Sequence, residues 1–216
     1  MKVAIFGATG MVGQGVLREC LLAPDVETVM TVGRTPTGQG DAKLRELVHR
    51  DFGDFSAIAG ELAGVDACFF CLGVSAVGLS EAEYRRITFD FTLAAARGLA
   101  SGPADATFIY VSGAGTGSGR MMWSRVKSET EQAVLALPLR AYMFRPGFIR
   151  PLHGITPRSR VYRVAYRVMA PLGGVFERRF PNLSTTTEKV GRAMLNAARH
   201  GAPKQILETP DINALA

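Results

Sequence analysis

Three glycines, spaced three residues apart, follow the first apolar run of the chain. Residues 7–13 read GATGMVG and come directly after Val3-Ala4-Ile5-Phe6. A glycine inside a strand or helix costs roughly 0.5–1 kcal/mol relative to alanine, so three of them need a structural reason. Between a first strand and a first helix, they allow a tight turn and a close approach of the backbone to a ligand. The pattern therefore predicts a phosphate-binding turn.

Each glycine has its own expected role in that turn. Gly7 allows the turn off the strand, Gly10 lets the backbone approach a pyrophosphate, and Gly13 lets the helix pack closely on the sheet. The first N–H groups of the helix and the positive end of its dipole then face the negative charge. The spacing is G-x-x-G-x-x-G, with Ala8 where the stricter dinucleotide fingerprint has glycine. The residues expected to contact the cofactor here are Gly7, Thr9, Gly10, Met11, Val12 and Gly13.

Apolar runs alternate with helical patterns along the whole chain. Strands are predicted at 2–6, 27–32, 46–50, 66–71, 107–112, 140–145 and 204–208. Helices are predicted at 10–22, 41–46, 55–63, 80–100, 119–136, 158–169 and from the box Thr185-Thr186-Thr187-Glu188 to about His200. The early strands are almost continuously apolar, which is typical of strands buried on both faces of a parallel sheet. The alternation predicts an α/β, doubly wound parallel sheet of about seven strands, a Rossmann fold.

Length and composition set the frame for this fold. With 216 residues, 47% of them hydrophobic, one domain is expected. Within it we expect a cofactor-binding core over 1–150, a small substrate-covering segment over 151–184, and a returning helix and last strand over 185–216. The sequence has no apolar stretch of the roughly 20 residues that a bilayer span needs, and no signal-peptide pattern, so a cytoplasmic location is expected.

Three cysteines fit a reducing compartment. Cys68 and Cys71 are three residues apart on a predicted strand, which places them on opposite faces. They are therefore interpreted as packing residues rather than as a redox pair.

The net charge of +6 is concentrated in the C-terminal third of the chain. Nine arginines, no lysine and one acid, Glu177, lie between Arg140 and Thr187, which gives this stretch a charge of +8. A helix over 158–169 would carry Arg160, Arg163 and Arg167 on one face. Three interpretations stay open for the Arg-rich 158–179 segment: a solvated face, recognition of an anionic small-molecule substrate, and peripheral membrane contact. The chain shows neither a nucleic-acid-binding motif nor metal-ligand spacing.

The end of the second strand indicates which dinucleotide binds. NAD-binding proteins place an acid there for the ribose 2′-OH, but here the sequence is Val32-Gly33-Arg34-Thr35, with no acid between Glu27 and Asp41. Arg34 is a permanently charged donor suited to a phosphate, and Thr35 adds a hydroxyl. NADP(H) is therefore predicted over NAD(H). Two further strand ends should reach the cofactor, and they supply Asp51 and Phe52, then Cys71, Leu72, Gly73 and Val74.

Taken together, these motifs resemble the short-chain dehydrogenase/reductases (SDRs). More narrowly, they resemble the atypical members that include NmrA-like and Tat-interacting-protein-like proteins. The resemblance rests on GATGMVG at 7–13, VGR at 32–34, CLG at 71–73, VSGAG at 111–115, VKSETE at 126–131 and FRPGFI at 144–149. It covers residues 1 to about 150 well and 185–215 loosely.

The resemblance implies catalytic positions. Catalytic SDRs use a serine with a Y-x-x-x-K pair, and Ser112 and Lys127 match the serine and the lysine. The resemblance also implies that Lys127 binds the cofactor by holding the nicotinamide ribose. The tyrosine position holds Trp123, whose indole donates a hydrogen bond but does not exchange a proton usefully. Alternative proton sources are Tyr110, His153, water or the substrate. The segment Pro146-Gly147-Phe148-Ile149 should pass the nicotinamide.

Three functions follow from these expectations. The first is an NADP(H)-dependent oxidoreductase acting on a small carbonyl or alcohol. The second is a non-catalytic NADP(H)-sensing regulatory or partner-binding protein, which the missing tyrosine favours. The third, an epimerase or dehydratase acting on a nucleotide sugar, is disfavoured because fewer than 70 residues follow Gly147.

Overall fold

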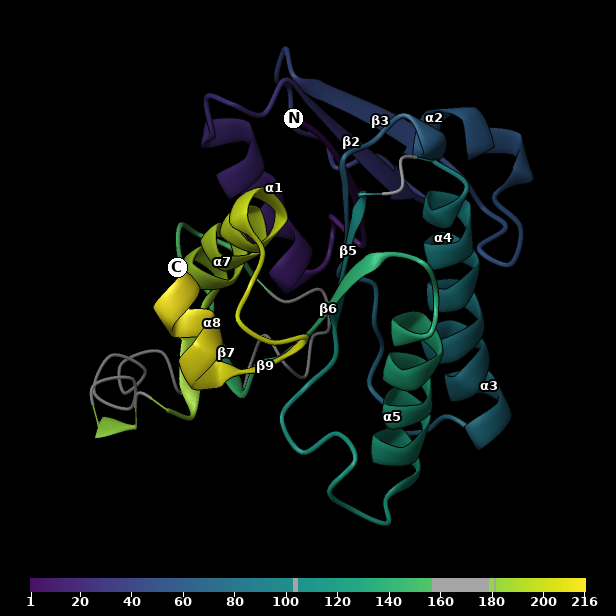
Figure 1. Cartoon of the computed structure of the whole chain (residues 1–216), viewed down its shortest axis with the longest axis vertical. Coiled ribbons are helices and arrows are strands. Elements are labelled where there is room, and N and C mark those ends of the chain that lie inside the picture. Colours follow the sequence, from purple (N-terminus) through teal and green to yellow (C-terminus); the bar gives the residue numbers. More distant parts are fainter. Residues whose placement is uncertain (103–104, 157–178, 181) are drawn as a thin grey trace.

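The computed structural model describes residues 1–102, 105–156, 179–180 and 182–216. Its centre is a seven-stranded parallel sheet in the order β3-β2-β1-β4-β5-β6-β9 (Figure 1). The strands are β1 (Lys2–Phe6), β2 (Thr28–Gly33), β3 (Leu44–Val48), β4 (Ala67–Phe70), β5 (Thr107–Val111), β6 (Arg140–Arg145) and β9 (Ile206–Glu208). The order reverses between β1 and β4, as in a dinucleotide-binding sheet. The predicted doubly wound α/β fold is confirmed.

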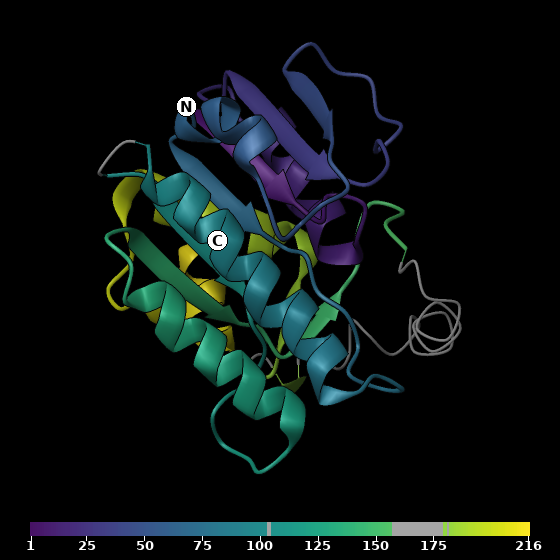
Figure 2. The ribbon, with the colours of Figure 1, turned by 90° about the vertical axis from the view of Figure 1, so that its right-hand side faces the viewer.

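Helices cover both faces of the sheet (Figures 1 and 2). One face carries α1 (Met11–Leu22), α7 (Thr187–His200) and α8 (Thr209–Leu215). The other carries α2 (Ala59–Ala63), α3 (Glu81–Arg85), α4 (Phe91–Ala100) and α5 (Met122–Leu135), with a 3₁₀ turn at Ser56–Ile58 and a π turn at Arg86–Asp90. Figure 2 shows α4 and α5 lying side by side on this face. Among the described residues, no helix has the length and apolar character needed to cross a membrane.

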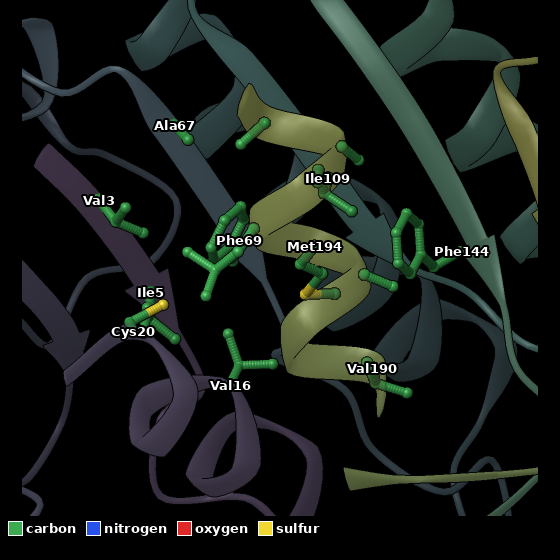
Figure 3. Packing of buried hydrophobic residues seen from close by; sticks show 14 of the residues in the cluster. Val3, Ile5, Val16, Cys20, Ala67, Phe69, Ile109, Phe144, Val190 and Met194 are labelled. Carbon is green, nitrogen blue, oxygen red and sulfur yellow. The ribbon is translucent and has the colours of Figure 1, made fainter. Parts of the chain in front are cut away.

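The apolar strand residues alternate between two cores. Ile5 of β1 points into the core beneath α1 and α7, whereas Phe6 points into the core beneath α4 and α5. Figure 3 shows Val16 of α1 and Met194 of α7 in the first of these cores, together with Phe69 of β4. Burying one such side chain contributes about 1.5–3 kcal/mol, which explains why these strands are almost continuously apolar in the sequence.

The helices α1 and α7 approach each other very closely. A β-carbon at Gly15 would lie 2.6 Å from the Cβ of Thr187, and one at Gly191 would lie 2.8 Å from the Cγ of Glu19. Glycine at both positions therefore allows the contact. Because α1 begins at the glycine turn, this packing fixes the helix end at which a phosphate was expected.

The helix predicted at 41–46 is wrong, because β3 occupies Leu44–Val48. The strand predicted at 46–50 therefore starts two residues earlier. Helix-favouring residues such as Leu44 and Glu46 suggested a helix, but their intrinsic preference is below about 0.7 kcal/mol each. Parallel pairing of β3 with the free edge of β2, from Val29↔Leu44 to Gly33↔Val48, outweighs this helix preference.

Two other expectations change near the C-terminus. The predicted helix start at Thr185 is wrong, because Ser184–Thr186 forms β8, which pairs in parallel with β7 (Phe148–Arg150). The Thr186 side chain instead caps α7 by accepting a hydrogen bond from the Lys189 N–H over 3.1 Å. The helix predicted over 158–169, and nearly all of the Arg-rich 158–179 segment, lie outside the described residues.

Candidate nucleotide site and catalytic cleft

The glycine turn has the strained, close-packed geometry that its sequence predicted. Gly7 has φ +77°, and a β-carbon there would lie 2.7 Å from the backbone N of Leu72. A β-carbon at Gly13 would lie 2.1 Å from the carbonyl oxygen of Gly7. Gly10 caps α1, so the helix begins without a side-chain acceptor, and its first turn has no acidic residue. The helix end therefore fits a bound anion.

A cavity of about 200 Å³ opens beside this turn; we call it the first cavity. It lies at the carboxyl ends of β1, β2 and β3, between the glycine turn and the loop that follows β2. The predicted cofactor residues that line it are Gly7, Thr9, Arg34, Thr35, Phe52 and Leu72. Ligands of parallel α/β sheets bind at this edge. The fold therefore brings six of the predicted cofactor residues to the first cavity.

The loop after β2 is held down by an acid that the sequence analysis did not single out. Oε1 of Glu46, on β3, accepts hydrogen bonds from the N–H and the hydroxyl of Thr37, each over 2.5 Å. Both residues line the first cavity. The carboxylate is therefore engaged with the loop that carries Arg34 and Thr35, and it fixes the loop beside the expected ribose position.

A second cavity, of about 400 Å³, adjoins the first. The two share Arg34, Phe52 and Leu72, and the second also contains the predicted Val74. Its remaining lining residues, which were not predicted, are Arg50, Leu79, Glu83, Arg86, Ile87 and Phe91.

The other strand-end residues lie around these cavities without lining them. The Asp51 carboxylate accepts the Gly53 N–H over 3.0 Å, which shapes the turn after β3. A β-carbon at Gly73 would meet nothing within 4 Å in the described part of the chain. Cys71 packs against the core opposite to that of Cys68, as expected, and burial raises its pKa to about 12. Both thiols are therefore packing groups and not reactive thiolates.

Ser112 and Lys127 meet at the carboxyl end of β5. The Lys127 ammonium, on α5, donates to the Ser112 carbonyl oxygen over 2.6 Å. The Ser112 hydroxyl lies 3.0 Å from the hydroxyl of Thr116, and both side chains are buried. The backbone N–H of Ser112 donates to the carbonyl oxygen of Phe144 over 2.7 Å. The pair predicted from the resemblance thus lies together, one strand over from β4.

Burial lowers the pKa of the Lys127 amine. Loss of water lowers its pKa from 10.5 to about 8, although the nearby Glu131 carboxylate opposes the shift. The ammonium also lies 5.6 Å from the ring centroid of Tyr110. A lysine in this state exchanges its proton near neutral pH, which an exposed lysine does not.

A buried ion pair stands one helical turn further along α5. The Glu131 side chain is 2% exposed, and its oxygens accept the Nε and Nη2 groups of Arg145 over 2.9 and 2.5 Å. Arg145 also reaches Glu208 over 3.3 Å. This arrangement ties α5 to the ends of β6 and β9, directly before Pro146.

Trp123 does not reproduce a catalytic phenol. A β-carbon at Gly115 would lie 3.5 Å from the Cη2 of Trp123, and the indole N–H donates to the sulfur of Met121 over 3.4 Å. Tyr110 is no better placed to supply a proton, because it is 1% exposed and burial raises its pKa well above the ordinary value. His153 pairs with Glu188 over 2.6 Å at the start of α7.

The Pro146–Ile149 segment is hydrogen-bonded to the loop after Ser112 on one side and to Leu183 on the other. The Ala114 N–H donates to the Pro146 carbonyl over 3.0 Å, which joins this segment to the loop after Ser112. A β-carbon at Gly147 would lie 2.4 Å from the Leu183 carbonyl oxygen, and the Phe148 N–H donates to that oxygen over 2.9 Å. Ile149 is buried in β7.

Fold and site together resemble the architecture of the short-chain dehydrogenase/reductases. The structure resembles an oxidoreductase of that family from Burkholderia thailandensis, with a TM-score of 0.68 and 20% identity over 96% of this chain and 89% of the other. It also resembles the enzyme WbmF of Bordetella bronchiseptica in complex with NAD⁺, with a TM-score of 0.70 and 14% identity over 100% of this chain and 76% of the other. These likenesses confirm the Rossmann fold that the resemblance to this class implied.

Sequence comparison gives the narrower assignment. The chain is 30% identical over 181 residues to the mitochondrial protein fmp52-1 of Aspergillus terreus, covering 80% of this chain and 76% of that protein. It is 28% identical over 206 residues to mitochondrial fmp52 of Emericella nidulans, covering 91% and 86%. No family model matches the chain. The chain belongs to the fmp52 family.

These relatives correct one expectation. The cytoplasmic location predicted from the sequence is contradicted, because the fmp52 proteins are named as mitochondrial. The signal-peptide and membrane-span criteria behind that prediction do not test for this compartment. The narrower resemblance to NmrA-like and Tat-interacting-protein-like members stays a prediction.

Proposed function

We propose that the chain is an NADP(H)-dependent oxidoreductase that acts on a small carbonyl or alcohol. The observation that carries the proposal is the Lys127–Ser112 contact of 2.6 Å at the same sheet edge as the Gly7 turn. Because the carboxyl ends of β1, β4 and β5 lie side by side, one extended dinucleotide would span from the turn to Lys127. The NAD⁺ complex of the structural neighbour WbmF supports a nicotinamide dinucleotide.

The residues around the glycine turn fit that group. The uncapped first turn of α1 suits the pyrophosphate, and Arg34 with Thr35 suits a ribose 2′-phosphate. Bound there, the nicotinamide would supply a hydride donor or acceptor. Pro146, Gly147 and the following residues would line its ring.

Lys127 would then carry the proton chemistry in place of the missing phenol. Its pKa of about 8 lets it donate or accept a proton near neutral pH. The hydroxyl pair of Ser112 and Thr116, 3.0 Å apart, would orient the substrate oxygen.

The test has two stages. Calorimetry on the folded chain should detect NADPH binding and weaker NADH binding. C4-deuterated NADPH is then incubated with a panel of small aldehydes and ketones, and the products are analysed for deuterium by mass spectrometry. Lys127→Met should bind NADPH but transfer little deuterium. Absence of binding to either coenzyme would overturn the proposal at its first stage.

A second candidate function rests on Trp123. Because an indole occupies the position of the phenol and donates to Met121, a non-catalytic NADP(H)-sensing protein fits the same cofactor residues. Tight NADPH binding with no deuterium transfer to any substrate would favour this function. A limited-proteolysis pattern that differs between NADPH and NADP⁺ would support sensing.

A further inference from the structure

The second cavity joins an apolar floor to a cluster of positive charge. Phe52 and Leu72, which also line the first cavity, form this apolar floor together with Phe91. The rings of Phe52 and Phe91 lie 5.7 Å apart. Arg34, Arg50 and Arg86 lie around this floor, and their side chains are exposed.

These guanidinium groups have no anionic partner within the described part of the chain. Neighbouring arginines do have one, since Arg85 pairs with Glu129 and Arg125 with Glu81. Among the described lining residues of the second cavity, the one acid is Glu83, and its carboxylate accepts the N–H and hydroxyl of Ser80 over 2.9 and 2.6 Å. Three guanidinium groups and one carboxylate leave the lining with a net charge of +2, which favours the entry of an anion.

A local irregularity of the helix places one of these arginines. The Phe91 N–H donates to the carbonyl of Arg86, five residues earlier, which defines the π turn. In a regular α-helix, residues five apart point in directions roughly 140° apart. The wider turn instead brings Arg86 and Phe91 to one cavity, with the guanidinium carbon 5.8 Å from the ring centroid. Such turns are frequent at functional sites.

We infer that Arg50 and Arg86 complete, together with Arg34, a three-guanidinium site for the 2′-phosphate of an adenosine group. The inference rests on the proposed NADP(H) function and deepens it by assigning two further specificity-determining residues. A flat purine suits the apolar floor of Phe52, Leu72 and Phe91. A phosphate dianion suits guanidinium groups, which bind its oxygens in pairs. Arg34 lines both cavities, so the phosphate would lie where they meet.

The experiment uses adenosine phosphates, which contain no nicotinamide. Calorimetry compares adenosine 2′,5′-bisphosphate with adenosine 5′-phosphate and with the 3′,5′-isomer, which carries the same charge at a different position. The unaltered chain should prefer the 2′,5′-isomer. Arg50→Gln and Arg86→Gln should each weaken its binding about tenfold, a typical loss for one charged hydrogen bond, and change binding of the 5′-phosphate less than about twofold. Arg97→Gln, exposed in the last turn of α4, is the control.

The outcomes separate this inference from the proposed function. If Arg34→Gln removes the preference for the 2′,5′-isomer while Arg50→Gln and Arg86→Gln keep it, the inference fails and the NADP(H) proposal stands. Equal losses for the 5′-phosphate and the 2′,5′-isomer would also overturn it, because the residues would then not recognise the 2′-phosphate. An unaltered chain without any preference among the three compounds would contradict the NADP(H) preference itself. Arg86→Lys keeps the charge but loses the paired donors. Its affinity for adenosine 2′,5′-bisphosphate should therefore lie between that of the unaltered chain and that of Arg86→Gln.

Discussion

The Lys127 ammonium donates to the Ser112 carbonyl oxygen over 2.6 Å and thereby joins α5 to the end of β5. The bond is made inside the fold, where loss of water penalises the charged amine and lowers its pKa from 10.5 to about 8. Stability should therefore respond to pH through this one side chain.

The sign of that response follows from the two pKa values. Because the folded value is lower, the folded chain binds fewer protons than the unfolded chain between about pH 8 and 10.5. The Lys127 contribution to the free energy of unfolding therefore rises with pH in this window. From about pH 7.5 to 9.5, the unaltered chain should gain about 2 kcal/mol relative to Lys127→Met.

Urea denaturation of both chains at the two pH values measures this difference. Other groups that titrate in the window, such as the buried cysteines, are present in both chains and cancel. A stability difference that is constant with pH would contradict the lowered pKa of Lys127.

Arg34 should discriminate between the two nicotinamide coenzymes. Arg34→Ala removes a guanidinium from the first cavity and should weaken NADPH binding about thirtyfold, near 2 kcal/mol, but NADH binding less than about threefold. Calorimetry with both coenzymes measures the ratio, and Arg45→Ala, exposed on β3, is the matched control. Equal losses for both coenzymes would remove the 2′-phosphate from this position.

Trp123 should report on the cofactor directly, because it is the only tryptophan of the chain. If its ring borders the nicotinamide, NADPH will quench its fluorescence and accept energy from it. Trp123→Tyr restores a phenol four residues before Lys127 and should raise carbonyl reduction about tenfold or more, the usual range for a well-placed acid. Unchanged fluorescence at saturating NADPH would place Trp123 outside the site.

Alanine substitutions at two glycines of the turn should have different effects, one on the stability of the fold and the other on NADPH binding. Gly13→Ala places a β-carbon 2.1 Å from the Gly7 carbonyl oxygen and should destabilise the fold by about 3 kcal/mol. At Gly10 the backbone angles (φ −78°, ψ 165°) suit alanine, and a β-carbon would lie 3.2 Å from the Gly7 carbonyl oxygen, a tight contact without overlap, so Gly10→Ala should cost much less stability than Gly13→Ala. Gly10→Ala should nevertheless weaken NADPH binding about tenfold by blocking the pyrophosphate. Normal binding by Gly10→Ala would mean that no phosphate approaches that backbone.

The overall fold was predictable because two local signals agree. Strands such as β1 are continuously apolar and end at glycine, and helices such as α3 start at a capping box, which the structure confirms at Ser80 and Glu83. The exception, β3, shows the limit of local preference. A strand was predicted from residue 46, but the residues before it were predicted as a helix, and pairing with β2, which the sequence does not display, extends the strand back to Leu44.

The candidate site was predictable where the chain turns at a strand end. Arg34, Phe52 and Leu72 follow different strands, yet the topology brings them to shared cavities. Arg50 immediately precedes Asp51 and could have been found by the same reasoning. Arg86 could not, because it reaches the second cavity through a π turn, and a regular helical period would direct it elsewhere.

The contact between α1 and α7 also sets the order of folding and nucleotide binding during synthesis. The phosphate turn and α1 belong to the first 22 residues, whereas α7, whose Gly191 packs against Glu19 of α1, is made after residue 186. During synthesis, the turn therefore leaves the ribosome long before the helix that supports it. A nascent chain would present only an unsupported turn, so capture of the nucleotide should follow release of the C-terminal helices from the exit tunnel.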